Sequence, residues 1–189
     1  MNDLCADIGW RSLNKKGEQL CGDHVDIVEN GDNSQVIVLA DGLGSGVKAS
    51  ILSTLTSKII STMMAEGLSV EDCVETIMAT LPVCSVRGVA YSTFTIIHIA
   101  DNREAEIIEY DNPQVIVIRN GEEYPVRRIE MNISGKKVYR SSVTLADGDF
   151  FIAMSDGCPH AGLGIKYNFG WKREDIVSFM IEHVYSGYT

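Results

Sequence analysis

Hydrophobic and polar residues alternate along many short stretches of the chain, which is typical of β-strands. A β-branched run over residues 35–40 (QVIVLA) is the clearest of them, and Asn120-Gly121 is a strong signal for a tight hairpin. The alternation predicts strands over residues 4–10, 24–29, 35–40, 91–100, 104–110, 115–119, 137–144 and 150–155.

The apolar spacing changes to that of a helix in three places. In residues 47–66, Ile51, Leu55 and Ile59 lie near one face at intervals of four. Residues 70–81 follow a capping box, Ser69 with an acid three positions later, and the third helix is expected at 171–185. Strands in runs, with helices as a pair and one at the end, favour an α+β fold of antiparallel sheets.

Composition narrows the class of protein. The chain has 189 residues, which we interpret as a single domain over 1–189, and its formal charge is −10, from 26 acids and 16 bases. Nucleic-acid binding needs a basic surface, so we expect no such partner. The longest apolar runs are five residues, and the N-terminus resembles no signal peptide, so we expect no membrane span and a cytoplasmic location.

The five cysteines indicate neither disulfides nor a zinc site, because their number is odd and no C-x-x-C pair occurs. A cysteine phosphatase would carry Arg six positions after the nucleophile. Gly164 follows Cys158 and Ala90 follows Cys84 at that spacing, so this class is excluded. We expect the cysteines to be small buried residues.

Two apolar strands run directly into Asp-Gly, at Asp41-Gly42 and at Asp156-Gly157. Asp-Gly is a good turn by itself, and Asp147-Gly148 is expected to be only that. Two carboxylates held at neighbouring strand ends would instead share a proton or bind a divalent cation. Asp23, beside another strand, is a third candidate, and spacing alone leaves both interpretations open.

The glycine-rich segment 42–50 matches no phosphate-binding or nucleophile motif. The P-loop, the dinucleotide fingerprint and the nucleophile elbow all fail on spacing. A flexible turn remains, which brings a helix N-terminus close to Asp41. That end suits a phosphate, but it is equally well explained as a helix cap.

Taken together, these motifs resemble the metal-dependent protein serine/threonine phosphatases, most closely the SpoIIE-like bacterial branch. The resemblance covers nearly the whole chain, and the motifs are specific as a set and weak one by one. They are Gly22-Asp23, residues 39–46 (LADGLGSG) with Lys48-Ala49-Ser50, Ser92-Thr93-Phe94, Gly148-Asp149 and Ser155-Asp156-Gly157.

The resemblance implies an αββα sandwich with two Mn²⁺ or Mg²⁺ ions between its sheets. By matching position, Asp41 would bridge both ions, the Gly42 carbonyl would bind one, and Asp156 would bind the other. Asp23 would contact an ion or hold its water. A water bridging the ions would attack the phosphorus of a phosphoserine or phosphothreonine on a bacterial regulatory protein.

The sequence departs from the family pattern at two points. Leu43 stands where the eukaryotic branch carries a His after the first Asp-Gly. The family also has a last strand with Asp-Asp-x-Thr, which this sequence lacks after the third helix, so we expect a chain truncated at its C-terminus. A non-catalytic binding module with an incomplete metal site is therefore an alternative. Hydrolysis of small phosphate esters or nucleotides is a third hypothesis.

The resemblance also suggests contacts beyond the metal ligands. Lys15 and Lys16, shortly before Asp23, are candidates for substrate phosphate, or else belong to a solvated loop. The predicted helix pair 47–81 resembles the regulatory helices of SpoIIE-like phosphatases and begins at a metal ligand. A regulatory partner at these helices could therefore change the position of Asp41 and Gly42.

Overall fold

The structure is a computed structural model that describes residues 4–15, 17–29, 34–80, 92–163, 166 and 168–185. Its strands form a six-stranded sheet in the order β1-β2-β3-β4-β8-β7 and a three-stranded sheet in the order β6-β5-β9, with every named pair antiparallel. The elements are β1 (Asp23–Glu29), β2 (Gln35–Gly42), α1 (Gly46–Ala65), α2 (Val70–Thr80), β3 (Ser92–Ala100), β4 (Glu104–Tyr110), β5 (Ile116–Arg119), β6 (Glu122–Glu123), β7 (Ile129–Ile133), β8 (Lys136–Thr144), β9 (Phe150–Ile152) and α3 (Arg173–Tyr185).

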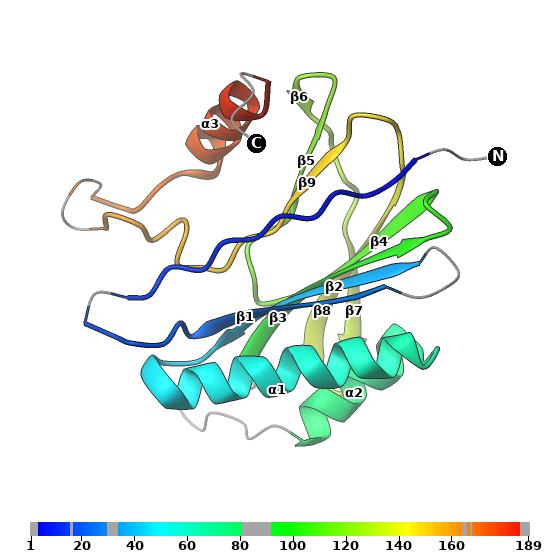
Figure 1. Cartoon of the computed structure of the whole chain (residues 1–189), viewed down its shortest axis with the longest axis vertical. Helices are drawn as coiled ribbons and strands as arrows, with labels where there is room; N and C mark the ends of the chain where they lie inside the picture. The colour runs from blue at the N-terminus through cyan, green and yellow to red at the C-terminus, as the bar shows by residue number, and fades with distance from the viewer. Residues whose placement is uncertain are drawn as a thin grey trace.

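Helices cover the outer faces of the two sheets, as Figure 1 shows. α1 and α2 lie on the six-stranded sheet, where Ile60 and Ile77 join Phe94 in one core cluster. A second cluster fills the space between the sheets, and a third packs α3 on β5 and β9. The predicted α+β class, with two antiparallel sheets and flanking helices, is confirmed.

Most predicted elements occur within two residues of their expected bounds. The hairpin at Asn120-Gly121 is confirmed, because both residues have the positive φ that its tight turn requires, 53° and 81°. The strand predicted at 4–10 is wrong, since that segment is extended but pairs in no sheet. β6 and β7 were not predicted, and the predicted helix end at Pro82 lies outside the described residues.

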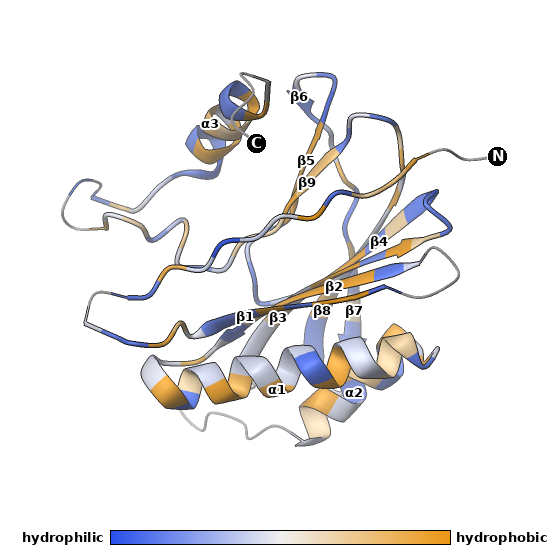
Figure 2. Cartoon of the chain, in the orientation of Figure 1, coloured by the Kyte–Doolittle hydropathy of each residue, from blue (hydrophilic) through white to orange (hydrophobic). Residues whose placement is uncertain are grey.

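α1 turns an unexpected face towards the sheet. Ile51 and Leu55 are 53% and 49% exposed, and Figure 2 shows apolar segments recurring along this helix. Polar groups of β1 explain the orientation, since His24 Nδ1 lies 2.9 Å from Ser57 Oγ and Asp26 accepts a hydrogen bond from Ser61. Ser57 and Ser61 satisfy these groups, on a buried face that also carries the apolar Leu52, Ile60 and Met64. Its polar members are Ser53, Thr56, Ser57 and Ser61, all fully buried.

The capping box at the start of α2 forms as predicted. Asp72 N donates to Ser69 Oγ at 3.1 Å, and Ser69 Oγ donates to Asp72 Oδ2 at 2.6 Å. Ser69→Ala should lower the free energy of unfolding by about 1 kcal/mol, because it removes the cap of the helix. Urea denaturation measures this loss. Glu75→Ala, an exposed change on the same helix, is the control and should stay within about 0.5 kcal/mol of wild type; equal losses would contradict the assignment.

The cysteines do not all behave as small buried residues. Cys73 is buried, Cys21 and Cys158 are half-buried and Cys5 is exposed, which corrects the expectation for Cys5. Cys84 lies outside the described residues. Within the described ranges, no helix combines the length and the apolar character needed to cross a membrane.

Candidate metal centre

Three segments bring carboxylates together at one end of the gap between the sheets. In the register of β1 and β2, Asp23 is paired with Asp41, so both side chains project from the same face of the sheet. Asp156 comes from the loop after β9, in the other sheet. The carboxyl group of Asp41 lies close enough to those of Asp23 and Asp156 to interact with both. The structure therefore gathers the three candidate carboxylates in one place.

The electrostatics of Asp41 are those of a crowded acidic site. Burial, followed by the negative charges of Asp23 and Asp156, raises the pKa of Asp41 from its ordinary value to about 8. A proton shared between carboxylates relieves this repulsion, and a divalent cation relieves it more strongly. The cluster is thus chemically suited to bind a cation.

Two serine hydroxyls hold these carboxylate-bearing segments in place. Ser155 Oγ donates to Asp23 Oδ2 at 2.7 Å, which joins the loop after β9 to the start of β1. Ser92 Oγ donates to the Asp41 carbonyl at 3.0 Å. Both serines belong to the motif set, but no local pattern predicts these bonds, because they span the two sheets or neighbouring strands.

Gly42 is in tight contact with the first turn of α1. A Cβ at Gly42 would lie 2.0 Å from the carbonyl oxygen of Ala49, so only glycine fits there. The Gly42 N–H donates to the Gly22 carbonyl at 3.1 Å. The strand that bears Asp41, the loop before Asp23 and the start of α1 are therefore packed as one unit.

The start of α1 is occupied by a carboxylate of the chain. Ser45, the N-cap residue, makes no side-chain capping bond to the helix, and instead donates its hydroxyl to Glu18 Oε1 at 2.9 Å. Sequence reasoning missed Glu18, which lies 27 residues from its partner. Of the two candidate phosphate contacts, Lys15 is exposed and Lys16 lies outside the described residues.

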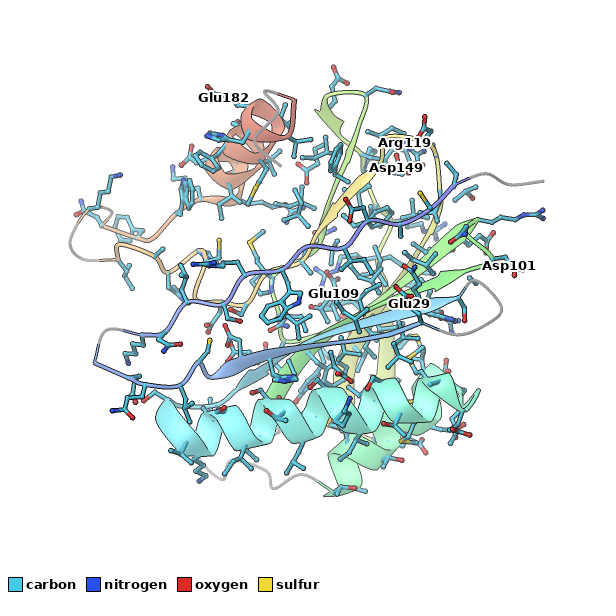
Figure 3. The ribbon with its side chains drawn as sticks, in the orientation of Figure 1. Glu29, Asp101, Glu109, Arg119, Asp149 and Glu182 are labelled. Carbon is cyan, nitrogen blue, oxygen red and sulfur yellow. The ribbon has the colours of Figure 1, made fainter. Side chains whose placement is uncertain are left out.

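Asp149, another residue of the motif set, binds an arginine and not the carboxylate cluster. Arg119 donates two hydrogen bonds to the Asp149 carboxylate, from Nε at 2.7 Å and from Nη2 at 2.6 Å. Figure 3 shows this pair away from α1. Asp147 is exposed in the turn that precedes Asp149, as predicted. His160 Nδ1 lies 3.9 Å from Asp156 Oδ2, and both side chains are more than half exposed. The two hydrogen bonds from Arg119 give Asp149 a structural role.

Two cavities among the described residues lie away from the carboxylate cluster. One of about 280 Å³ and one of about 150 Å³ flank Arg173, and neither is lined by the three carboxylates. Across the described ranges, no group of three or more His, Cys, Asp or Glu side chains converges in the geometry of a metal site. The donors that Asp41 gathers are still the carboxylate oxygens that Mn²⁺ and Mg²⁺ prefer, so their chemistry fits such ions.

Solved structures of several bacterial phosphatases have a similar fold. The structure resembles the PP2C phosphatase domain with a regulatory fragment of SpoIIE from Bacillus subtilis, with a TM-score of 0.68 and 21% identity over 92% of this chain and 55% of that chain. RsbX in complex with magnesium has a TM-score of 0.59 and 24% identity, covering 91% and 84%. A serine/threonine phosphatase of S. agalactiae has a TM-score of 0.59 and 15% identity, covering 94% and 89%.

The fold is therefore that of the PP2C-type (PPM) bacterial serine/threonine phosphatase domains. The family model described as Stage II sporulation protein E (SpoIIE) matches residues 31–178, and the chain belongs to this family. The chain spans about half of the SpoIIE structure, 55% of its length. No curated protein sequence matches it.

Proposed function

We propose that this protein hydrolyses phosphoserine or phosphothreonine on a bacterial regulatory protein in the cytoplasm, using Mn²⁺ or Mg²⁺. The observation that supports it most directly is the contact of Asp41 with both Asp23 and Asp156, across two sheets. Family membership supports the reaction class. No arginine stands six positions after Cys84 or Cys158, which agrees with a mechanism that needs no thiol nucleophile.

The residues that would hold the ions are Asp23, Asp41, Asp156 and the carbonyl of Gly42. Bound divalent ions would supply positive charge for the phosphoryl oxygens and lower the pKa of a water. The relative RsbX is described in complex with magnesium. Two ions are expected at this site, as the resemblance implies.

The chain's own groups would then fix the geometry of the reaction. Asp41 orients the reacting centre from the middle of the carboxylate cluster, and Ser155 holds Asp23 through its hydroxyl. Lys15 and Lys16 would contact the phosphate of the substrate. Because Leu43 has no titratable group, the leaving serine or threonine oxygen would take its proton from water or from another residue.

A regulatory partner at residues 47–81 forms part of the same proposal. The first turn of α1 touches Gly42 through Ala49, so a displacement of α1 reaches the metal ligands directly. Val47 and Ile51 are 63% and 53% exposed on this helix, which offers apolar surface to such a partner.

The second candidate is a binding module that keeps the phosphatase fold with an incomplete metal site. It is favoured by the lack of a converged ligand set among the described residues and by the exposed side chain of Asp156, which is 65% accessible. Such a module would recognise a phosphoprotein without hydrolysing it. Metal binding and turnover separate the two candidates.

The test is phosphate release from phosphoserine and phosphothreonine peptides, with and without Mn²⁺, beside a panel of nucleotides. We expect release from the peptides only when metal is present and little from the nucleotides. Preference for nucleotides would favour the small-ester hypothesis. Metal binding without release from any substrate would support the binding module and contradict the proposal.

A further inference from the structure

The segment before Asp23 forms a closed loop that presents the carboxylate of Glu18. The Glu18 N–H donates to the Lys15 carbonyl at 2.9 Å, and Asn14 Nδ2 donates to the Gln19 carbonyl at 2.9 Å. The two ends of the loop meet where the Cys21 thiol lies 3.6 Å from the Leu13 carbonyl oxygen. Glu18 is therefore held on a folded loop, which fixes where its carboxylate points.

That carboxylate lies at the start of α1. Glu18 Oε1 accepts the hydrogen bond of Ser45, and Glu18 Oε2 lies 3.0 Å from the position that a Cβ on Gly46 would take. A larger residue at 46 would displace the carboxylate, and the φ of +69° at Gly46 also favours glycine. Glu18 therefore packs directly on the first residue of the helix.

α1 lacks the N-terminal features that its neighbours possess. It has no acidic residue in its first turn and no capping bond from Ser45. α2 carries its own capping box with two acids, and α3 has two acids in its first turn. A helix N-terminus is stabilised by nearby negative charge, and for α1 the charge within hydrogen-bond distance of its N-cap comes from Glu18.

The contact joins the two segments that carry candidate metal ligands. Glu18 belongs to the loop that leads into Asp23, and Ser45 belongs to the turn that follows Asp41 and Gly42. Beyond Ser45, α1 presses its first turn against Gly42. A change in the start of α1 is therefore transmitted to a ligand backbone, and Glu18 lies at the point where both segments meet.

We propose that Glu18 is a positioning residue of the metal centre, which caps α1 from outside the helix and fixes the 42–46 turn relative to Asp23. This role of Glu18 rests on the proposed function, because it concerns the metal affinity of the cluster formed by Asp23, Asp41 and Asp156. It predicts that loss of the carboxylate weakens metal binding although Glu18 touches no metal ligand side chain.

The experiment compares Glu18→Ala and Glu18→Gln with Glu182→Ala, an exposed glutamate on α3 that Figure 3 labels. Titration calorimetry with Mn²⁺ should show a rise in Kd of roughly 10-fold for Glu18→Ala, as for other residues that support metal ligands. Glu18→Gln keeps the acceptor for Ser45 and should recover part of the affinity. Glu182→Ala should bind Mn²⁺ as wild type does.

Hydrogen exchange on the metal-free protein gives a second reading that needs neither metal nor activity. Amides of residues 49–52, which make the first hydrogen bonds of α1, should exchange roughly fivefold faster in Glu18→Ala, as expected for a lost cap. Ser45→Ala should show the same change, and the double variant should be no worse than either single variant, since both remove one interaction.

The outcomes distinguish the two proposals. If Glu18→Ala binds Mn²⁺ and exchanges at 49–52 as wild type does, the role of Glu18 is overturned and the proposed function stands. If wild type binds no Mn²⁺, the proposed function fails and positioning of a metal centre fails with it, while faster exchange in Glu18→Ala would still assign the external cap. Weaker Mn²⁺ binding together with faster exchange supports the proposal.

Discussion

Asp41→Asn is expected to abolish Mn²⁺-dependent hydrolysis of phosphopeptides. Asp41 interacts with both Asp23 and Asp156, and its amide replacement supplies neither the charge nor the second anionic oxygen. Loss of a residue that merely supports a metal ligand costs roughly 10- to 100-fold in affinity or activity, so loss of the central ligand should cost more than about 100-fold. Steady-state kinetics over a range of Mn²⁺ concentrations measures the effect.

The matched control is Asp147→Asn, which makes the same chemical change in the Asp147-Gly148 turn. Asp147 is exposed in a turn, and the neighbouring Asp149 makes the bonds that stabilise that turn. We expect the activity of this variant to remain within twofold of wild type. An equal loss in both variants would show that the effect of Asp41→Asn is not specific to the carboxylate cluster.

Gly42→Ala should have the second large effect, on stability and on metal binding together. The new Cβ would lie 2.0 Å from the Ala49 carbonyl oxygen and 2.6 Å from its carbonyl carbon, so α1 and the end of β2 must move apart. Overpacking of this kind costs about 3 kcal/mol of unfolding free energy. Thermal or urea denaturation gives the loss of stability, and calorimetry gives the Mn²⁺ affinity of the folded variant.

Gly22→Ala tests whether this effect comes from the close contact or from any added methyl near the site. Its Cβ would lie 3.4 Å from the Ala49 Cβ, which is ordinary van der Waals contact, and its φ lies outside the left-handed region. We expect a change of less than about 1 kcal/mol. If Gly22→Ala is as destabilising as Gly42→Ala, the packing of α1 on Gly42 is not the cause.

Local signals in the sequence predicted the elements that position the site. The β-branched run ending at Asp41-Gly42, the capping box at Ser69 and the Asn120-Gly121 hairpin all depend on neighbouring residues, and all three form. The pairing of β1 with β2 then brings Asp23 opposite Asp41. The contact between Asp23 and Asp41 was therefore predictable once the two strands were recognised.

Contacts between distant segments could not be predicted from local patterns. The hydrogen bond from Ser155 to Asp23 spans 132 residues, and that from Ser45 to Glu18 spans 27. Neither leaves a periodic or spacing signal. The repeated strand-Asp-Gly pattern did suggest that Asp156 belongs with Asp41. It expected the two at neighbouring strand ends, and this was wrong, because β2 and β9 lie in different sheets.

The face that α1 buries was hidden for a different reason. Apolar spacing is informative when the buried side of a helix is apolar, and here β1 offers His24 and Asp26 to the helix. Ser57 and Ser61 match these groups, so the buried face mixes hydroxyl residues with apolar ones such as Ile60, and Ile51 remains exposed. The hydrophobic pattern therefore located the helix but not its orientation.

Asp41 and Asp156 are expected to bind the same cluster of divalent cations. Crystals grown with Mn²⁺ and measured at the manganese absorption edge test this expectation most directly, because anomalous scattering locates the metal independently of activity. We predict anomalous density within ligand distance of both carboxylates in wild type and its loss in Asp41→Asn. Saturating Mn²⁺ with no density beside Asp41, or density unchanged in Asp41→Asn, would contradict the account.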